Sequence, residues 1–285
     1  MKKIKIADNL YDLGKKTLVM GVLNVTPDSF YDGGKHDNIE DAVKHAIQME
    51  KDGADIIDIG GESTRPGSVS IPLSVELARV IPVVEELAQK LKIPISIDTY
   101  NSEIAKKALD LGAAMLNDIT ALREDKNMGK IAADHDVPVV LMHMLGEPSS
   151  MQFNPEYEDV IFDIKNFLKI RASYAESCGI KKENIIVDPG IGFGKRTGEG
   201  IEDNCAIIKR LSEFKDLGYP ILIGASRKTF IGNLIGKDKA KSPEERLEGS
   251  LAAAVVAAMN GANIIRVHDV KETRHCLDVV DCIIR

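Results

Sequence analysis

Eight short apolar runs alternate along the chain with segments of helical periodicity, and this alternation limits the fold more than any other feature. The runs lack the polar residue at every second position that a half-exposed strand has, so we expect parallel strands that are buried on both faces. The expected strands are Thr17–Leu23, Ala54–Gly60, Pro94–Asp98, Ala114–Asp118, Val137–His143, Asn184–Val187, Pro220–Ala225 and Asn263–Val267.

Amphipathic segments fill most of the intervals between these runs, and glycine often marks their ends. We expect helices at Ile39–Lys51, Leu73–Leu91, Ser102–Leu111, Glu156–Cys178, Ile201–Phe214, Ser242–Met259 and Lys271–Ile284, with a short edge strand or hairpin in the first fifteen residues. A (β/α)8 TIM barrel is the natural closure for this pattern, and a doubly wound open sheet is the alternative. No Pro/Gly/Ser linker divides the chain, so residues 1–285 are expected to form a single domain.

The composition limits the kinds of molecule that the protein can bind and the cellular compartment in which it is expected. The 285 residues carry a formal net charge of -7 without any Lys/Arg run, which argues against a nucleic-acid or membrane partner. The four cysteines show neither C-x-x-C pairs nor metal-ligand spacing, and the first ten residues are too polar for a signal peptide. These features predict a reduced, cytoplasmic protein.

A glycine-rich turn follows one carboxylate, in the stretch Val187–Lys195 with the sequence VDPGIGFGK. Pro189 and three glycines at alternate positions cannot continue a strand, and they suit a backbone that passes close to a ligand. Asp188 can therefore be either the cap of an ordinary strand-to-helix turn or part of a binding site.

Polar side chains stand at nearly every expected strand end, and the carboxyl ends of barrel strands form the active face. These are Asn24, Asp58, Asp98, Asn117, Asp118, His143, Asp188, Ser226, Arg227, Lys228, Arg266 and His268. Because they converge on one mouth, we interpret them as a ligand site.

The charges are sorted around this expected mouth. Carboxylates and amides dominate the third to sixth strands and cations the last two, where Arg266 and His268 point the same way and suit a phosphoryl group. Alternatively, Arg266 pairs with a structural carboxylate. A buried Asp188 prefers two parallel N–H groups, which a guanidine-like heterocycle presents. The set is poor for zinc or iron, whereas a Mg²⁺ ion carried by a diphosphate could touch the Asn24 amide.

Several long motifs resemble the dihydropteroate synthase family of pterin-binding enzymes. They are LNVTPDSF, GGESTRPG, SIDT, NDI, MHM followed by MQ, VDPGIGFGK, GASRKTFIG and RVHDV, and together they span about residues 18 to 270. The resemblance implies a pterin-binding barrel that condenses 7,8-dihydropterin-6-ylmethyl diphosphate with 4-aminobenzoate to 7,8-dihydropteroate in folate biosynthesis. The family is the target of sulfonamide inhibitors, and the resemblance also implies Mg²⁺ as cofactor and a homodimer packed through the C-terminal helices.

The resemblance assigns roles residue by residue. It implies catalytic roles for Asp98, Lys228, Arg266 and His268, and a pterin pocket of Asp98, Asn117, Met142, Asp188 and Lys228. It implies a diphosphate site of Asn24, Arg266 and His268, with Asn24 also touching the metal, and an aminobenzoate pocket of Thr64, Arg65, Pro66, Phe193 and Thr229. Thr229 departs from the family, in which serine is frequent at this place, and Tyr31 departs likewise.

Two loops, residues 24–36 and 62–71, are polar, glycine-bearing and long, and we expect them to close over the substrates. Two other functions fit parts of the pattern. A methyltetrahydrofolate-dependent methyltransferase domain would need the pterin set but no diphosphate site. A non-catalytic pterin-binding homologue would keep the fold without turnover.

Overall fold

The computed structural model describes residues 3–26, 35–62, 71–146, 151, 153, 155–196, 202–236 and 239–285. Eight parallel strands form its central sheet, in the spatial order β8-β7-β6-β5-β4-β3-β10-β9. Their bounds are β3 Leu18–Asn24, β4 Ile56–Gly60, β5 Ile95–Asp98, β6 Met115–Asp118, β7 Val139–Met142, β8 Ile185–Asp188, β9 Leu222–Ile223 and β10 Ile264–Val267.

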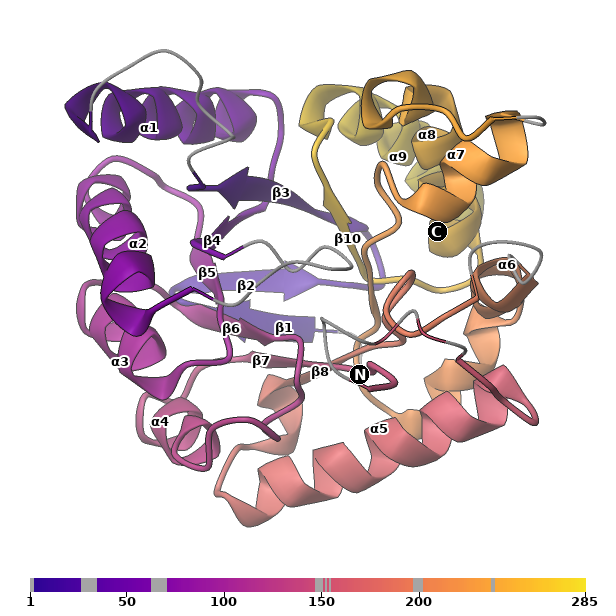
Figure 1. Cartoon of the computed structure of the whole chain (residues 1–285), viewed down its shortest axis with the longest axis horizontal. Coiled ribbons are helices and arrows are strands. Elements are labelled where there is room, and N and C mark those ends of the chain that lie inside the picture. The colour runs from indigo at the N-terminus through magenta and orange to yellow at the C-terminus, as the bar shows by residue number, and fades with distance from the viewer. Residues whose placement is uncertain are drawn as a thin grey trace.

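The two edges of this sheet meet, which makes it a barrel. A parallel bridge joins Val187 to Ile221, next to β9, and the Val187 amide donates to the Pro220 carbonyl at 2.9 Å. Figure 1 shows the strands surrounded by the helices in chain order. The predicted barrel is confirmed, and the doubly wound open sheet, whose edges stay apart, is wrong.

Burial on both faces of each strand produces two separate apolar regions. Val19 and Ile57 belong to the large cluster between the strands and the outer helices. Met20 and Ile56, one position away, belong to a second cluster inside the barrel. Successive side chains of a strand point to opposite faces, so a barrel strand needs apolar residues in succession.

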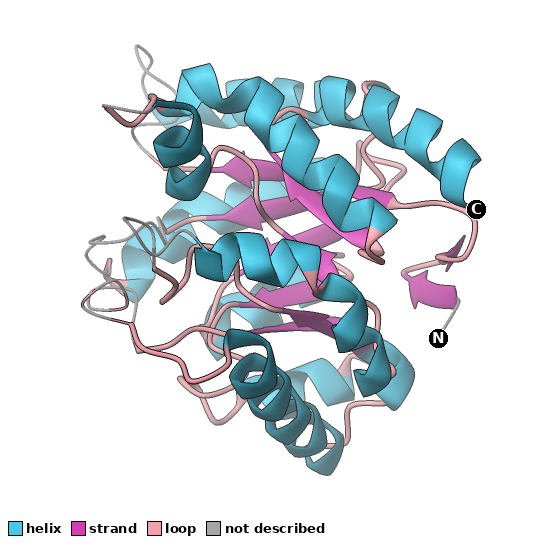
Figure 2. Ribbon diagram, turned by 90° about the vertical axis from the view of Figure 1, so that its right-hand side faces the viewer, coloured by secondary structure: helices cyan, strands magenta, loops and turns pink. Residues whose placement is uncertain are grey.

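The amino-terminal hairpin covers one end of the barrel interior. Strands β1 (Lys3–Ile6) and β2 (Asn9–Asp12) pair antiparallel, as the sequence led us to expect. Ile4 and Ile6 are almost completely buried and belong to the interior cluster. Figure 2 shows the hairpin at one end of the strands, so the other end is left for ligands.

The helices that cover the strands largely follow the prediction, with differences at their ends and among the short helices. Their bounds are α1 Lys35–Lys51, α2 Leu73–Ala88, α3 Ser102–Asp110, α4 Met128–Asp134, α5 Val160–Ser177, α6 Glu202–Lys209, α7 Thr229–Gly236, α8 Leu247–Met259 and α9 Val270–Ile284. Helices α4 and α7 were not predicted, because each is shorter than the span over which a helical period becomes clear. The predicted helix Ile201–Phe214 is correct as far as Lys209 and wrong in its last turn, since Leu211–Leu217 forms 3-10 turns.

The expected cap at Ser242 is confirmed, but the α-helix begins later than predicted. Ser242 and Glu245 form a reciprocal capping box, and Pro243 follows the cap. The first turn, Pro243–Arg246, is a 3-10 turn, and the α-helical part begins at Leu247. No helix in the described ranges is long and apolar enough to span a membrane.

A buried carboxylate ties the last helix to the first barrel strand. Asp281 of α9 accepts hydrogen bonds from the Thr17 amide at 2.7 Å, the Thr17 hydroxyl at 2.6 Å and Arg285 Nε at 2.8 Å. Although burial raises the pKa of Asp281, the Thr17 and Arg285 contacts lower it below the usual value. The carboxylate is therefore charged at neutral pH and joins residues at opposite ends of the chain.

Replacing this carboxylate should weaken the fold. We expect Asp281→Asn to lower the free energy of unfolding by about 2–3 kcal/mol, because charge-assisted hydrogen bonds to buried groups are lost. Because the native state lowers this pKa, the contribution is complete at neutral pH and is lost as pH falls below the carboxyl range. Urea unfolding at pH 7 and pH 3 measures both effects.

The matched control for this experiment lies one turn earlier on the same helix. Asp278 pairs with Arg274 at 2.7 Å, but its side chain is 61% exposed against 9% for Asp281. Asp278→Asn should cost less than about 1 kcal/mol, as exposed ion pairs do. Equal losses in the two variants would contradict the assignment of Asp281 as the anchor.

Candidate active site

Several of the predicted site residues are neighbours in the strand pairing at the mouth of the barrel. Strand register pairs Asn24 with Gly60, Gly60 with Asp98, and Asp98 with Asn117. On the next part of the ring, Met142 pairs with Asp188. The parallel register thus brings together side chains from β3, β5, β6, β7 and β8, as the strand-end pattern predicted.

The guanidinium of Arg266 crosses the mouth from β10 and holds two carboxylates. Its Nε donates to Asp58 Oδ2 and its Nη2 to Asp98 Oδ2, both at 2.6 Å. Asn117 Nδ2 adds a bond of 2.9 Å to the same Asp58 oxygen. Asp58 has no exposed surface, so these donors compensate the burial of its charge.

The predicted separation of charge around the mouth is therefore wrong for Arg266. In this structure the alternative holds, since Arg266 is paired with carboxylates of β4 and β5 rather than standing apart on the last strand. Arg227 is also paired within the protein, because its guanidinium forms two hydrogen bonds to Asp269, at 3.0 and 2.5 Å. Opposite charges meet at the centre of the mouth.

Burial changes the protonation of the mouth carboxylates. It raises the pKa of Asp98, while Arg266 acts in the opposite direction. Burial likewise raises the pKa of Asp188 to about 6, against the effect of the Gly190 amide and Lys228. Both groups gain free energy from a ligand that brings N–H donors, because such donors stabilise the ionised form.

Among the residues predicted to bind the pterin, three acceptor atoms receive no hydrogen bond from the described residues. Asp98 uses only Oδ2, for Arg266, and Asp188 uses only Oδ1, which accepts from the Gly190 amide at 2.7 Å. Asn117 donates through Nδ2, and its side-chain carbonyl oxygen accepts no hydrogen bond from these residues. Asp98 Oδ1, Asp188 Oδ2 and Asn117 Oδ1 are thus available to the donors of a ligand.

The glycine turn after Asp188 is packed too closely for any side chain at Gly190. This residue has φ +73°, and a Cβ placed on it would lie 1.9 Å from the His143 carbonyl oxygen. The His143 amide in turn donates to the Asp188 carbonyl at 2.9 Å. The turn therefore rests directly on the backbone that follows β7.

A buried lysine holds the same turn from inside. Lys195 is fully buried, and its Nζ lies 2.9 Å from the Gly190 carbonyl, 2.8 Å from the Phe193 carbonyl and 3.0 Å from His143 Nδ1. Burial lowers the pKa of Lys195 to about 7, and burial together with Lys195 keeps the pKa of His143 well below its usual value. Three acceptors match the three N–H groups of an ammonium ion.

An apolar wall adjoins the polar ring. Met142 and Phe193 are buried in one cluster with Ile119, Met144 and Met151. Lys228 lies over the face of Phe193, with Nζ 4.0 Å from the ring centroid. Asp188 and Phe193, the two ends of the glycine turn, therefore face a polar and an apolar surface respectively.

His268 is a neutral member of the set, although it stands among cations. Burial, with Arg266 and Arg227 nearby, lowers its pKa to about 3. Its Nδ1 lies 3.1 Å from Ser226 Oγ. Thr229 is exposed and is the first residue of α7, where helix amide groups are not used within the helix.

The remaining predicted positions cannot be located in the same way. Thr64, Arg65 and Pro66 lie outside the described residues, as do residues 27–34 and 63–70 of the two loops that we expected to close. Within the described ranges, no group of three or more His, Cys, Asp or Glu side chains could hold a metal ion. The half-buried Asn24 receives no hydrogen bond on its amide oxygen from these residues.

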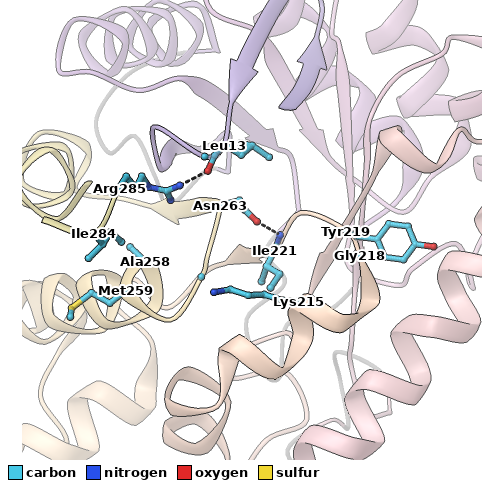
Figure 3. Close-up of a pocket in the computed structure, with 12 residues that line it drawn as sticks. Leu13, Lys215, Gly218, Tyr219, Ile221, Ala258, Met259, Asn263, Ile284 and Arg285 are labelled. Carbon is cyan, nitrogen blue, oxygen red and sulfur yellow. Dashed lines mark hydrogen bonds between the residues drawn. The ribbon is translucent and has the colours of Figure 1, made fainter. Parts of the chain in front are cut away.

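The structure also contains a pocket of about 530 Å³ that has no part in the predicted site (Figure 3). Its lining includes Ile221 and Asn263, at the starts of β9 and β10, together with Lys215 and Arg285. It lies at the hairpin end of the barrel, away from the carboxyl ends of the strands. We therefore define the candidate site by the strand ends.

Three residues acquire roles that the sequence pattern did not give them. Asp58 anchors Arg266, Lys195 holds the glycine turn, and Ser226 contacts His268. The sequence pattern already placed Asp58 and Ser226 among the polar residues of the expected mouth, but it gave neither of them a specific contact. Burial of Lys195 could not be read from the sequence, because lysine is almost always exposed.

Comparison with known proteins agrees with this geometry. The family model of pterin binding enzymes matches residues 20–268. The dihydropteroate synthase of Escherichia coli (strain K12) is 48% identical over 263 residues, which are 92% of this chain and 90% of that protein.

Solved structures give the same answer. A Yersinia pestis dihydropteroate synthase with a sulfonamide drug complex aligns with a TM-score of 0.91 at 42% identity, covering 99% of this chain and 98% of that chain. A Xanthomonas albilineans dihydropteroate synthase with 4-aminobenzoic acid aligns with a TM-score of 0.90 at 43% identity and the same coverage. The chain belongs to the dihydropteroate synthase family of pterin-binding enzymes.

Proposed function

We propose that the chain condenses (7,8-dihydropterin-6-yl)methyl diphosphate with 4-aminobenzoate, giving 7,8-dihydropteroate and diphosphate. The observation that carries this proposal is the set of three unused acceptors, Asp98 Oδ1, Asp188 Oδ2 and Asn117 Oδ1, beside the cations Arg266 and Lys228. A pterin presents several N–H donors in one plane, and a diphosphate presents negative charge. One mouth therefore suits both ends of this substrate.

The pterin end is assigned to the acidic side of the mouth. Asp188 accepts the paired N–H groups of the pyrimidine ring, while Asp98 and Asn117 take the remaining polar edge. Met142 supplies an apolar face for the ring, and Lys228 lies close enough to Phe193 to border both substrates. Arg266 can stay on Asp58 while its Nη2 turns from Asp98 towards the ligand.

The diphosphate end is assigned to Asn24, Arg266 and His268. Arg266 is charged and His268 is neutral, so the first supplies charge and the second an N–H donor. Departure of diphosphate breaks a C–O bond and leaves cationic character on the pterin methylene carbon. Donors around the leaving group and carboxylates around the heterocycle stabilise both partial charges.

A Mg²⁺ ion fits this end as a companion of the diphosphate. One amide oxygen, that of Asn24, is too little for a resident metal site, but Mg²⁺ commonly binds through one or two protein oxygens together with phosphates and water. When bound, it would neutralise charge on the diphosphate.

The arylamine is assigned to the surface formed by Phe193, Lys228 and Thr229. The ring of 4-aminobenzoate would lie along Phe193, and its carboxylate would approach the amino end of α7 at Thr229. Thr64, Arg65 and Pro66 complete this pocket by the family resemblance. The amine nitrogen forms the new C–N bond and loses one proton, which solvent or the departing diphosphate accepts.

We also propose a homodimer in a reducing, cytoplasmic setting. The exposed fractions of Val279 and Ile283, one turn apart on α9, are 61% and 73%, and Met259 of α8 is 56% exposed. Exposed apolar side chains that share a helix face, as Val279 and Ile283 do, are typical of protein interfaces. All four cysteines are free thiols, which suits a reducing compartment.

Turnover tests the proposed reaction directly. Purified protein, the dihydropterin diphosphate, 4-aminobenzoate and Mg²⁺ should release diphosphate and form dihydropteroate in equal amounts. Chelation of Mg²⁺ should slow the reaction. Release no faster than in a heat-denatured sample would exclude the synthase activity and favour a binding protein.

Asp188→Asn should weaken pterin binding while sparing the arylamine site. We expect the Kd for the dihydropterin diphosphate, measured by calorimetry, to rise roughly 100-fold, because two charge-assisted hydrogen bonds are lost. Wild-type affinity should fall as pH drops below about 6, where the raised pKa of Asp188 leaves the carboxyl protonated. The variant should show a shallower pH profile.

The control for this variant is Asp216→Asn, at an aspartate that is 79% exposed and pairs with Lys165 on the surface. It should leave the Kd and its pH profile unchanged. A normal pterin Kd in Asp188→Asn, or an equally large change in the KM for 4-aminobenzoate, would refute the two-pocket assignment.

Charge on α9 should break the proposed dimer. The double variant Val279→Asp, Ile283→Asp is expected to sediment as a monomer at micromolar concentration, because desolvating two carboxylates opposes association. The control is Phe162→Asp with Ile170→Asp on α5, whose exposed fractions of 63% and 66% are similar. Loss of association in the control alone would move the interface to α5.

A further inference from the structure

Ser226 and His268 share two contacts that together fix where the histidine carries its proton. Ser226 stands at the end of the segment after β9 and is buried, and its Oγ lies 3.1 Å from His268 Nδ1. The backbone amide of His268 donates to the same oxygen at 3.2 Å. One hydroxyl therefore meets both the main chain and the ring of the same residue.

The hydrogen count at this hydroxyl distinguishes the two neutral forms of the ring. If Nδ1 carried the proton, it would donate to Ser226 Oγ, and the hydroxyl hydrogen would need another acceptor. Among the described residues Ser226 has no other hydrogen-bond partner. If Nδ1 is bare, the hydroxyl donates to it and accepts from the His268 amide, so every group is satisfied.

We propose that Ser226 is a positioning residue that holds His268 in its Nε2–H form, which turns an N–H donor towards the diphosphate of the substrate. This inference rests on the proposed role of His268 at the diphosphate. The other form would present a lone pair to an anion and would repel it. Ser226 acts through His268 and need not touch the substrate.

The segment that carries Ser226 is held in place by a network on its far side. Arg227 has φ +59°, a conformation that residues other than glycine rarely adopt. Its amide donates to Ser250 Oγ at 2.9 Å, its carbonyl accepts from Arg246 Nη1 at 2.7 Å, and its guanidinium pairs with Asp269.

This network links Ser226 and His268 from both sides. Asp269 follows His268 directly in the chain, while Arg227 follows Ser226. The Arg227–Asp269 pair therefore clamps the two neighbouring segments at a fixed separation. A strained residue kept by several independent contacts is a common feature of functional sites, and here it sets the distance between the hydroxyl and the imidazole.

Nitrogen NMR of the histidine ring tests the proton position without any turnover. In protein labelled with ¹⁵N-histidine, the signals of His268 are identified by their absence in His268→Gln. We expect a protonated Nε2 and an unprotonated Nδ1 in the wild type. In Ser226→Ala the Nδ1–H form should become populated, and in Ser226→Thr, which keeps the hydroxyl, the wild-type pattern should return.

Inhibition by inorganic pyrophosphate with Mg²⁺ tests the consequence for binding. Ser226→Ala should weaken this inhibition roughly threefold to tenfold, the range expected for one hydrogen bond. Glutamine has a fixed N–H donor and no choice of proton position. Ser226→Ala should therefore change pyrophosphate inhibition little in a His268→Gln background, whereas a merely structural role of Ser226 would cost the same in both.

The outcomes separate this inference from the diphosphate assignment. A protonated Nδ1 in the wild type, or an unchanged ring pattern in Ser226→Ala, overturns the role of Ser226. Equal losses of inhibition in the two backgrounds also overturn it. If His268→Ala leaves pyrophosphate inhibition unchanged while the NMR pattern is as expected, the diphosphate assignment fails instead.

Discussion

The guanidinium of Arg266 is the interaction on which the mouth of this barrel depends. It joins β10 to the ends of β4 and β5 through Asp58 and Asp98, and Asn117 adds the end of β6. Two buried carboxylates this close together would repel each other strongly without a cation between them. The charges at the mouth are thus paired within the protein, and these pairs hold the ends of β4, β5, β6 and β10 together.

The two carboxylates that bind Arg266 differ in their surroundings. Asp58 is completely buried, and its Oδ1 has no hydrogen-bond partner among the described residues. Its Oδ2 accepts from Arg266, which is the contact that compensates the buried charge. Asp98 keeps some exposure and one unused oxygen. We infer that one carboxylate anchors the guanidinium and the other yields to substrate. In the same way, Lys195 Nζ binds two carbonyls of the glycine turn, while Asp188 keeps one oxygen available.

Much of this organisation could be predicted from the sequence, because it depends on local patterns. Continuous apolar runs predicted the parallel strands, and polar residues such as Asp98, Asn117 and Asp188 at their ends predicted one mouth. The short helices α4 and α7 were missed because fewer than three turns carry little periodic signal. The pairing of Arg266 with Asp58 and Asp98 joins residues more than 160 positions apart, and no local pattern encodes which of several possible partners a long side chain reaches.

The close contact at Gly190 has a consequence for inhibitor design. Because a Cβ at this position would overlap the His143 carbonyl, the turn cannot acquire a side chain without moving the backbone after β7. A compound that binds the main chain of this turn would meet a surface that point mutation can hardly reshape. Resistance to such a compound would have to arise at neighbouring positions, where side chains already exist and a substitution destabilises the fold less.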